Sequence, residues 1–234
     1  MSLARRVEPE MLDSLPAEDP RAVRSRKDLR RVNRIMGTCG LIGGALDPIV
    51  NASPTARIVE LGAGDGSLML RIARRHARHW PKLRIGLLDM QPVVRADTLI
   101  GFQDEGWYAR VIGADVFDWL AQPADGDAPI VVANLFVHHF DGERLRALLT
   151  GIASKAGAFV CCEPRRNRFA YAGAAMMWAI GCNGVTVNDG MLSVRAGFNH
   201  DELSALWPDR DAWSLREDRA GPFVHRFVAV RREG

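Results

Sequence analysis

Residues 57–66, Arg-Ile-Val-Glu-Leu-Gly-Ala-Gly-Asp-Gly, decide the fold. Their first half, with Ile58, Val59 and Leu61, is typical of a strand, and three alternating glycines follow it directly. Residues 67–76 then place Leu68 and Ile72 on one face of a helix. Glycines between a strand and a helix permit a tight turn and let the backbone approach a ligand closely. This stretch therefore predicts a ligand-binding loop at the carboxyl end of a strand in an α/β sheet.

Strand-like and helix-like segments alternate along the rest of the chain. The further strand-like runs are residues 84–89, 108–115, 130–135 and 158–164. A helix lies before the last of these, and its apolar face carries Leu145, Leu148, Leu149 and Ile152. The alternation requires crossover connections and predicts a doubly wound, mostly parallel, Rossmann-like sheet with helices on both faces. Two strand-like runs around Gly221-Pro222 predict a C-terminal antiparallel hairpin.

The first part of the chain differs from this pattern. Asp19-Pro20 predicts a helix start and Gly37 its end. We expect Leu29, Val32 and Met36 on the buried face of this helix, and a solvated face rich in arginine. We therefore expect residues 1–52 to form an N-terminal helical segment or lid, and residues 53–234 to form the main domain.

A second departure is the segment 164–208, which is too long for a simple loop. We expect an apolar helix over 169–180, a loop over 181–190 and a short helix from Asn199. The segment lies between the fifth strand and the hairpin, which favours a substrate cap, with a purely structural core helix as the alternative. In the cap interpretation, five side chains line an apolar pocket: Phe169, Tyr171, Met176, Met177 and Trp178.

Composition excludes several classes of protein. The 234 residues are 47% hydrophobic and 25% charged with a net charge of +3, which fits one sizeable folded core and does not indicate a nucleic-acid binder. No apolar run reaches the length of about 20 residues that a membrane span needs, and the N-terminus does not resemble a signal peptide. None of the four cysteines has the spacing of a zinc site or a disulfide framework. We expect a protein of the cytoplasm whose cysteines are reduced.

Acidic residues distinguish the glycine loop from a dinucleotide-binding loop. The spacing is GxGxG instead of GxGxxG, and Glu60 precedes the first glycine by two positions. Asp89 ends the second strand, where a carboxylate is suited to ribose hydroxyls. Asp115 ends the third, where it is suited to an adenine amino group, while the Val116 N–H meets the ring. A carboxylate at Glu60 favours a ligand with an ammonium group over one with a pyrophosphate.

This combination resembles the class I, Rossmann-like S-adenosylmethionine-dependent methyltransferases over residues 57–163. The similar motifs are VELGAGDGS, LLDM, GADVF and NLFVHHF. The resemblance implies S-adenosyl-L-methionine as cofactor. The cofactor-binding residues that we predict are Glu60, Gly62, Ala63, Gly64, Gly66, Asp89, Met90, Asp115, Val116, Asn134 and Leu135. The motifs LRRVNRIMG and SVRAGF also resemble small-molecule methyltransferases found beside polyketide-type pathways.

The resemblance implies methyl transfer to a small molecule, with a hydroxyl of a phenolic or polyketide-type metabolite as the first choice. Alternatives are C-methylation of a quinone or aromatic ring, and a binding or scaffold protein that kept the fold without turnover. The Asn/Asp-Pro-Pro-aromatic motif of many N-methyltransferases is absent, because Leu135 and Phe136 follow Asn134. We predict no metal and no nucleic-acid partner, and leave the oligomeric state open, a homodimer included.

Two histidines follow the fourth strand, at the sheet edge where ligands bind. Histidine suits the role of general base because its pKa lies near neutrality. We predict His139 as the base, with His138 as second choice. The alternative is that His139 packs against the cofactor or caps the helix starting near Asp141.

Overall fold

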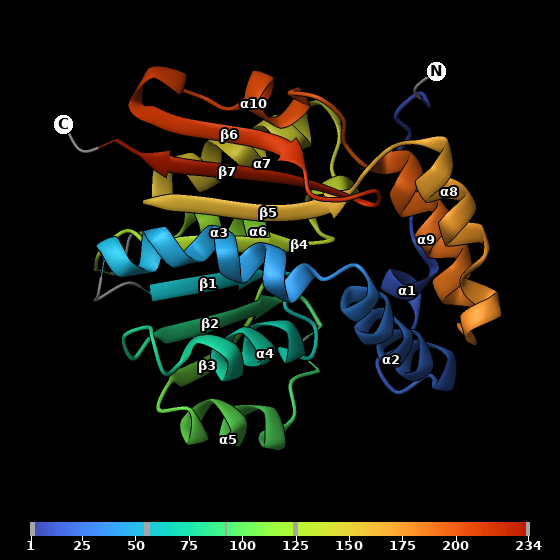
Figure 1. Cartoon of the computed structure of the whole chain (residues 1–234), viewed down its shortest axis with the longest axis horizontal. Coiled ribbons are helices and arrows are strands. Elements are labelled where there is room, and N and C mark those ends of the chain that lie inside the picture. The colour runs from blue at the N-terminus through green and yellow to red at the C-terminus, as the bar shows by residue number, and fades with distance from the viewer. Residues whose placement is uncertain (1–2, 54–56, 92, 124–125, 233–234) are drawn as a thin grey trace.

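The computed structural model describes residues 3–53, 57–91, 93–123 and 126–232. Its centre is a seven-stranded sheet in the order β3-β2-β1-β4-β5-β7-β6, in which only β7 runs antiparallel to its neighbours (Figure 1). The predicted doubly wound sheet with its C-terminal hairpin is thereby confirmed. The strands are β1 (Arg57–Leu61), β2 (Arg84–Asp89), β3 (Tyr108–Gly113), β4 (Ile130–Asn134), β5 (Ala158–Pro164), β6 (Trp213–Arg219) and β7 (Val224–Arg231).

Helices bury both faces of the sheet because side chains of each central strand alternate between two apolar cores. Ile58 belongs to the core beneath α3, α4 and α5, whereas Val59 belongs to the core beneath α6, α7 and α10. The helix bounds on the first face are α3 (Thr38–Ala52), α4 (Ser67–His76) and α5 (Ala96–Asp104). Those on the second are α6 (Val116–Ala121), α7 (Gly142–Lys155) and α10 (Glu202–Leu206).

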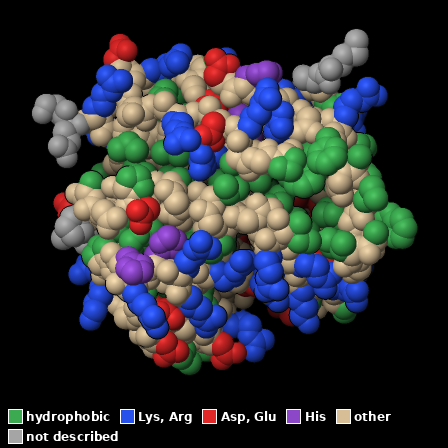
Figure 2. Space-filling model, viewed as in Figure 1, with side chains coloured by type: hydrophobic (Ala, Val, Ile, Leu, Met, Phe, Trp, Pro, Cys, Tyr) green, Lys and Arg blue, Asp and Glu red, His purple; other side chains and the backbone are tan. Residues whose placement is uncertain are grey.

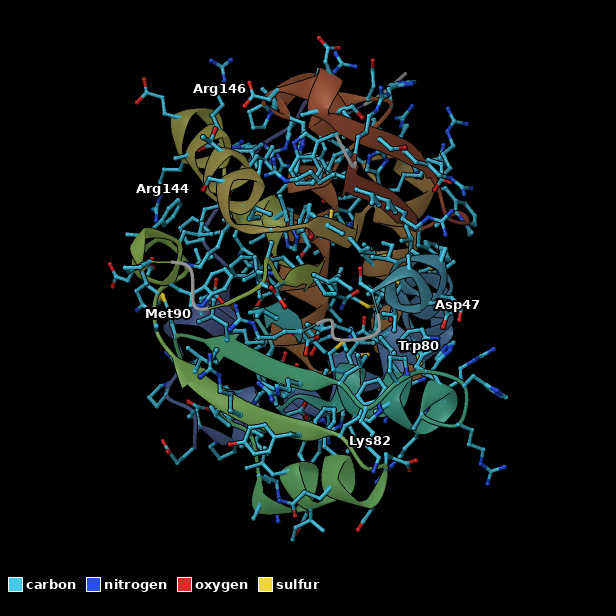
Figure 3. The ribbon with its side chains drawn as sticks, turned by 90° about the vertical axis from the view of Figure 1, so that its left-hand side faces the viewer. Asp47, Trp80, Lys82, Met90, Arg144 and Arg146 are labelled. Carbon is cyan, nitrogen blue, oxygen red and sulfur yellow. The ribbon has the colours of Figure 1, made fainter. Side chains whose placement is uncertain are left out.

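Helix α3 is part of the main domain by its contacts. Its Ile42, Leu46 and Val50 are fully buried in the first core. The Trp80 indole N–H donates to Asp47 at 2.7 Å, and Figure 3 shows these two side chains close together. Helix α3, which ends at the predicted boundary of residue 52, therefore packs on the sheet together with the residues that follow it.

The remaining helices gather at one end of the sheet, beyond the carboxyl ends of its parallel strands (Figure 1). They are α1 (Met11–Ser14), α2 (Pro20–Ile35), α8 (Arg168–Ala175), the 3₁₀ turn η2 (Met177–Ile180) and α9 (Gly184–Ala196). Helix α9 contacts α1, α2 and α8. Two further 3₁₀ turns, η1 (Val137–His139) and η3 (Arg210–Ala212), follow β4 and precede β6.

Helix α2 begins as predicted but buries a different face. The Asp19 carboxylate caps it by accepting the Arg21 N–H at 2.8 Å. Its buried residues are Ala22, Ser25 and Asp28, not the predicted apolar set, which is only partly buried. The reason is a polar interface, in which the Thr186 hydroxyl of α9 donates to Ser25 at 2.9 Å.

The insert 164–208 differs from the prediction at three points. The apolar helix breaks at Met176 into α8 and η2. The predicted loop 181–190 contains the first half of α9, whose start is capped by Asn183 accepting the Thr186 N–H. The short helix α10 starts at Glu202, not at Asn199. The Asn199 N–H donates to the Glu202 carboxylate at 3.1 Å, as the capping-box spacing predicts, but the Asn199 side chain donates to the Arg166 carbonyl.

Within the described ranges no single helix is long and apolar enough to cross a membrane, although α2 and α3 pass that test together as a pair bent by 63°.

Candidate functional site

The glycine loop after β1 has the conformation that its sequence predicts. Gly62, Gly64 and Gly66 all have positive φ, between +54° and +70°, which side chains rarely adopt. A Cβ on Gly62 would meet the Phe136 ring, whereas one on Gly64 would have no atom within 4 Å. The backbone at Gly64 therefore faces open space where a ligand can approach.

Glu60 is buried beneath this loop. Its Oε2 atom has no hydrogen-bond partner among the described residues. Burial raises the pKa of Glu60 well above its usual value, and the charges of Asp65 and Asp89 raise it further. A buried carboxylate without a partner is costly, and a cationic ligand group would supply the missing partner.

Asp89 lies beside the glycine loop at the end of β2. Its Oδ2 accepts the Gly64 N–H and its Oδ1 accepts the Gln91 N–H, both at 2.8 Å. Burial raises the pKa of Asp89. Each carboxylate oxygen has a further lone pair, so the group is able to accept ligand hydroxyls as well. The next residue, Met90, is largely exposed and lies beyond the end of β2 in Figure 3.

The other predicted cofactor residues lie at the ends of β3 and β4. The Asp115 side chain caps α6 by accepting the Phe117 N–H at 2.7 Å, and Val116 is buried. The Asn134 amide donates to Asn33 of α2 at 3.2 Å, while its buried oxygen has no partner among the described residues. Leu135 has φ +53°, a strained conformation that often marks a functional site.

Helix α2 contacts the glycine loop and the end of β4. Arg30 pairs with Asp65 of the glycine loop, and Asn33 contacts the end of β4 as described. The Arg26 charge lowers the pKa of Asp89 and so opposes the effect of burial, which raises it. The partly buried side of this helix thus faces the candidate ligand site, a role that its arginine-rich sequence did not reveal.

His138 is the centre of a buried ion-pair cluster. Its Nδ1 lies 2.7 Å from Oε2 of Glu163, and its Nε2 lies 3.3 Å from Oε1 of Glu10. Glu163 also accepts the backbone N–H groups of Phe136, Val137 and His138. Burial alone lowers the pKa of His138, but the two carboxylates outweigh it and raise the pKa to about 9.

His139 is more exposed than its neighbour and lies farther from its carboxylate partner. Its side chain is 25% exposed, and its Nδ1 lies 3.4 Å from Oδ2 of Asp13. Burial lowers the pKa of His139, and the charge of His138 lowers it further. No carboxylate holds His139 as Glu163 holds His138, so the orientation of His139 is less tightly defined.

Glu163 and Glu10 are site residues that the sequence analysis missed. Glu163 stands before a proline at the end of an apolar strand, and that buried position at the ligand edge was the available signal. Glu10 lies in an N-terminal segment 128 residues from His138, which no local pattern connects to the site.

The predicted apolar pocket of the insert is wrong for three of its five residues. Phe169, Met176 and Trp178 are largely exposed, with 66%, 62% and 69% of their surfaces accessible, and the Phe169 ring stacks on Phe223. Tyr171 and Met177 are partly buried against Ala170 and Ala174. The inner side of α8 carries small alanines, whereas Phe169, Met176 and Trp178 are largely exposed.

No family model matches the chain, and no curated protein sequence matches it. Solved structures do match. An O-methyltransferase family protein from Burkholderia thailandensis has 16% identity and a TM-score of 0.60 over 93% of this chain. The plantazolicin methyltransferase BpumL in complex with SAH has 10% identity and a TM-score of 0.62, covering 92% of each chain. The mitomycin 7-O-methyltransferase MmcR has 20% identity and a TM-score of 0.53 over 95% of this chain.

At these identities the likeness concerns the fold, which this chain shares with the methyltransferase structures just described. The chain spans 62% of the Burkholderia protein and 60% of MmcR, so those proteins contain additional structure.

Proposed function

We propose that the protein transfers a methyl group from S-adenosyl-L-methionine to a hydroxyl of a small molecule, of the phenolic or polyketide type. The observation that carries the proposal is the buried Glu60 carboxylate, whose free oxygen lies under an open glycine loop. Adenosylmethionine, when bound, supplies a methyl group on a positively charged sulfur. Its ammonium group is the kind of partner that Glu60 lacks.

The chain's own residues divide the task of holding this cofactor. Glu60 and the Asn134 oxygen provide acceptors for the ammonium end. Asp89 provides acceptors for the ribose hydroxyls, and Asp115 and Val116 flank the adenine position. Phe136 connects this half of the site to the histidines, because its ring packs on Gly62 and η1 follows it directly.

On the acceptor side, His138 has the geometry of an oriented base. The Glu163 carboxylate binds Nδ1 and fixes the orientation of the ring, so that Nε2 points away from Glu163. Glu10 occupies Nε2 in this structure and helps to keep the imidazole protonated. An acceptor hydroxyl would take the place of Glu10, which removes one of the two carboxylates that raise the pKa of His138 and so favours the neutral, proton-accepting form. His138, the second choice from the sequence, is therefore our proposed base, and His139 becomes the neighbour that shapes the pocket.

The cofactor assignment is tested by calorimetry with adenosylmethionine, adenosylhomocysteine and NAD. We expect the first two to bind and NAD to bind much more weakly. Glu60→Gln keeps the shape but cannot form the carboxylate that a bound ammonium group would stabilise, so it should weaken adenosylmethionine binding about tenfold or more, since charge-assisted bonds contribute about 1.5–3 kcal/mol. Tighter binding of NAD would overturn the proposal. Turnover is then followed as adenosylhomocysteine release with phenolic acceptors.

Asp89 gives a second test of the same site. Asp89→Ala should weaken adenosylmethionine binding at least about tenfold, because two hydroxyls lose a charged acceptor. Asp118→Ala is the matched control, since Asp118 lies on the exposed face of α6. Unchanged affinity in the Asp89 variant, with its melting temperature preserved, would remove Asp89 from the cofactor site.

A further inference from the structure

The outer surface of α8 and η2 has the reverse of the usual helix pattern. Large apolar side chains face solvent there, while Ala170 and Ala174 face the interior. A surface helix normally places its large apolar residues inward. Four large apolar side chains lie exposed within twelve residues: Phe169, Met176, Trp178 and Ile180. Apolar surface of this kind marks an interaction site.

Basic side chains of α2 adjoin this apolar surface. Arg31 donates to the Ile180 carbonyl at 2.8 Å, and Arg24 donates to the Gly181 carbonyl at 3.2 Å. Lys27 is exposed between them on the same helix. Figure 2 shows the Lys and Arg side chains over α2 next to the apolar side chains over α8.

Acidic side chains offset part of this charge. Asp28, buried against α9, accepts the Asn183 N–H and also pairs with Arg31 at 3.6 Å, whereas Asp19 pairs with Arg21. Glu18 is the exposed acid nearest in sequence to the basic turns. The surface formed by Arg24, Lys27, Arg31 and the four apolar side chains is called the basic–apolar face below.

We propose that the basic–apolar face docks onto an anionic lipid bilayer. Trp178 and its apolar neighbours would enter the interfacial layer, where tryptophan is favoured because its ring is amphipathic. Arg24, Lys27 and Arg31 would contact lipid phosphates. The apolar side chains protrude, with exposed fractions of 44–69%, as insertion into a lipid surface requires. This docking does not depend on the proposed methyl transfer.

The tryptophans make the proposal directly measurable. Five of the six, Trp80, Trp107, Trp119, Trp207 and Trp213, are buried with 2–6% exposure. Trp178 is therefore the one whose fluorescence responds to a new environment. With the full chain and vesicles of phosphatidylcholine and phosphatidylglycerol, we expect co-sedimentation, a blue shift, and quenching by brominated lipid. Vesicles of phosphatidylcholine alone should bind much less, and salt should weaken binding.

Variants distinguish binding through the basic–apolar face from nonspecific binding. Lys27→Glu should reduce binding to the anionic vesicles about tenfold or more, because the reversal replaces an attraction to the anionic surface with a repulsion. Arg110→Glu, on the exposed side of β3, should have little effect. Trp178→Ser should abolish the blue shift and weaken binding, whereas Tyr108→Ser, with 61% exposure, should not.

Any of four results would overturn the proposal. Two of them are equal binding to both kinds of vesicle and no binding to either. The third is an unchanged Trp178 spectrum in the presence of anionic vesicles. The fourth is a dimer in light scattering that Trp178→Ser dissociates, which would assign the face to a second copy of the chain.

Discussion

Replacing His138 with glutamine is expected to lower kcat by about 10²–10⁴-fold, the usual contribution of a general base. The glutamine amide can still donate to Glu163, but it cannot take a proton from the acceptor. Adenosylmethionine affinity should change little, because Glu60 and Asp89 hold that ligand. The loss should shrink for acceptors with more acidic hydroxyls, which need less help in losing the proton.

His139→Gln is the matched control and should cost much less activity. The reverse order of the two losses would make His139 the base, and equal small losses would indicate catalysis by proximity alone. Glu10→Gln adds a pH test. Glu10 raises the pKa of His138 in the free protein, so its neutralisation should move the acidic limb of kcat/KM to lower pH. A profile that does not move would show that His138 is not the titrating group.

The second large effect concerns stability. Glu163→Ala leaves the His138 imidazolium and three backbone N–H groups without their buried acceptor. We expect the free energy of unfolding to fall by about 3–5 kcal/mol, as when one partner of a buried ion pair is removed. Urea denaturation measures this loss. Glu143→Ala, on the exposed first turn of α7, should stay within about 0.5 kcal/mol of the original chain.

The same cluster gives the wild-type chain a defined pH dependence. The pKa of His138 is raised from 6.5 to about 9 by Glu10 and Glu163, while His139 beside it opposes the charge. Its contribution to stability is therefore complete below pH 6.5 and is lost as the pH rises through 9. The loss amounts to about 3 kcal/mol. His138→Gln should flatten this slope, and an unchanged slope would place its origin elsewhere.

The sequence predicted the sheet well because the signals there are local. Ile85–Leu88 is a continuous apolar run, Ile58–Leu61 is one apart from Glu60, and glycine or aspartate follows each; burial on both faces requires such a composition. Helix α9 was missed for the opposite reason. Gly184, Val185 and Thr186 are poor helix formers, so the helix depends on contacts with α2 that no sequence window contains.

The candidate site divides in the same way. The glycine loop, Glu60 and Asp89 follow successive strands, so their meeting at one sheet edge is predictable from chain order. The cluster around His138 is different, because its members come from residue 10, the turn after β4 and the end of β5. Charged partners that meet only after folding leave no periodic trace in the sequence.

The segment that carries Glu10 also has a kinetic consequence. Asp189 holds it by accepting the Met11 and Leu12 N–H groups at 2.9 Å, and Arg5 holds it by donating to the Ala196 and Phe140 carbonyls at 2.8 Å. If His138 is the base, an acceptor reaches its Nε2 atom only after the segment around Glu10 has moved away from it. This movement then becomes a step of each catalytic cycle, and its rate sets an upper limit on turnover however fast the chemistry is. Acceptors of very different reactivity would in that case share one maximal rate.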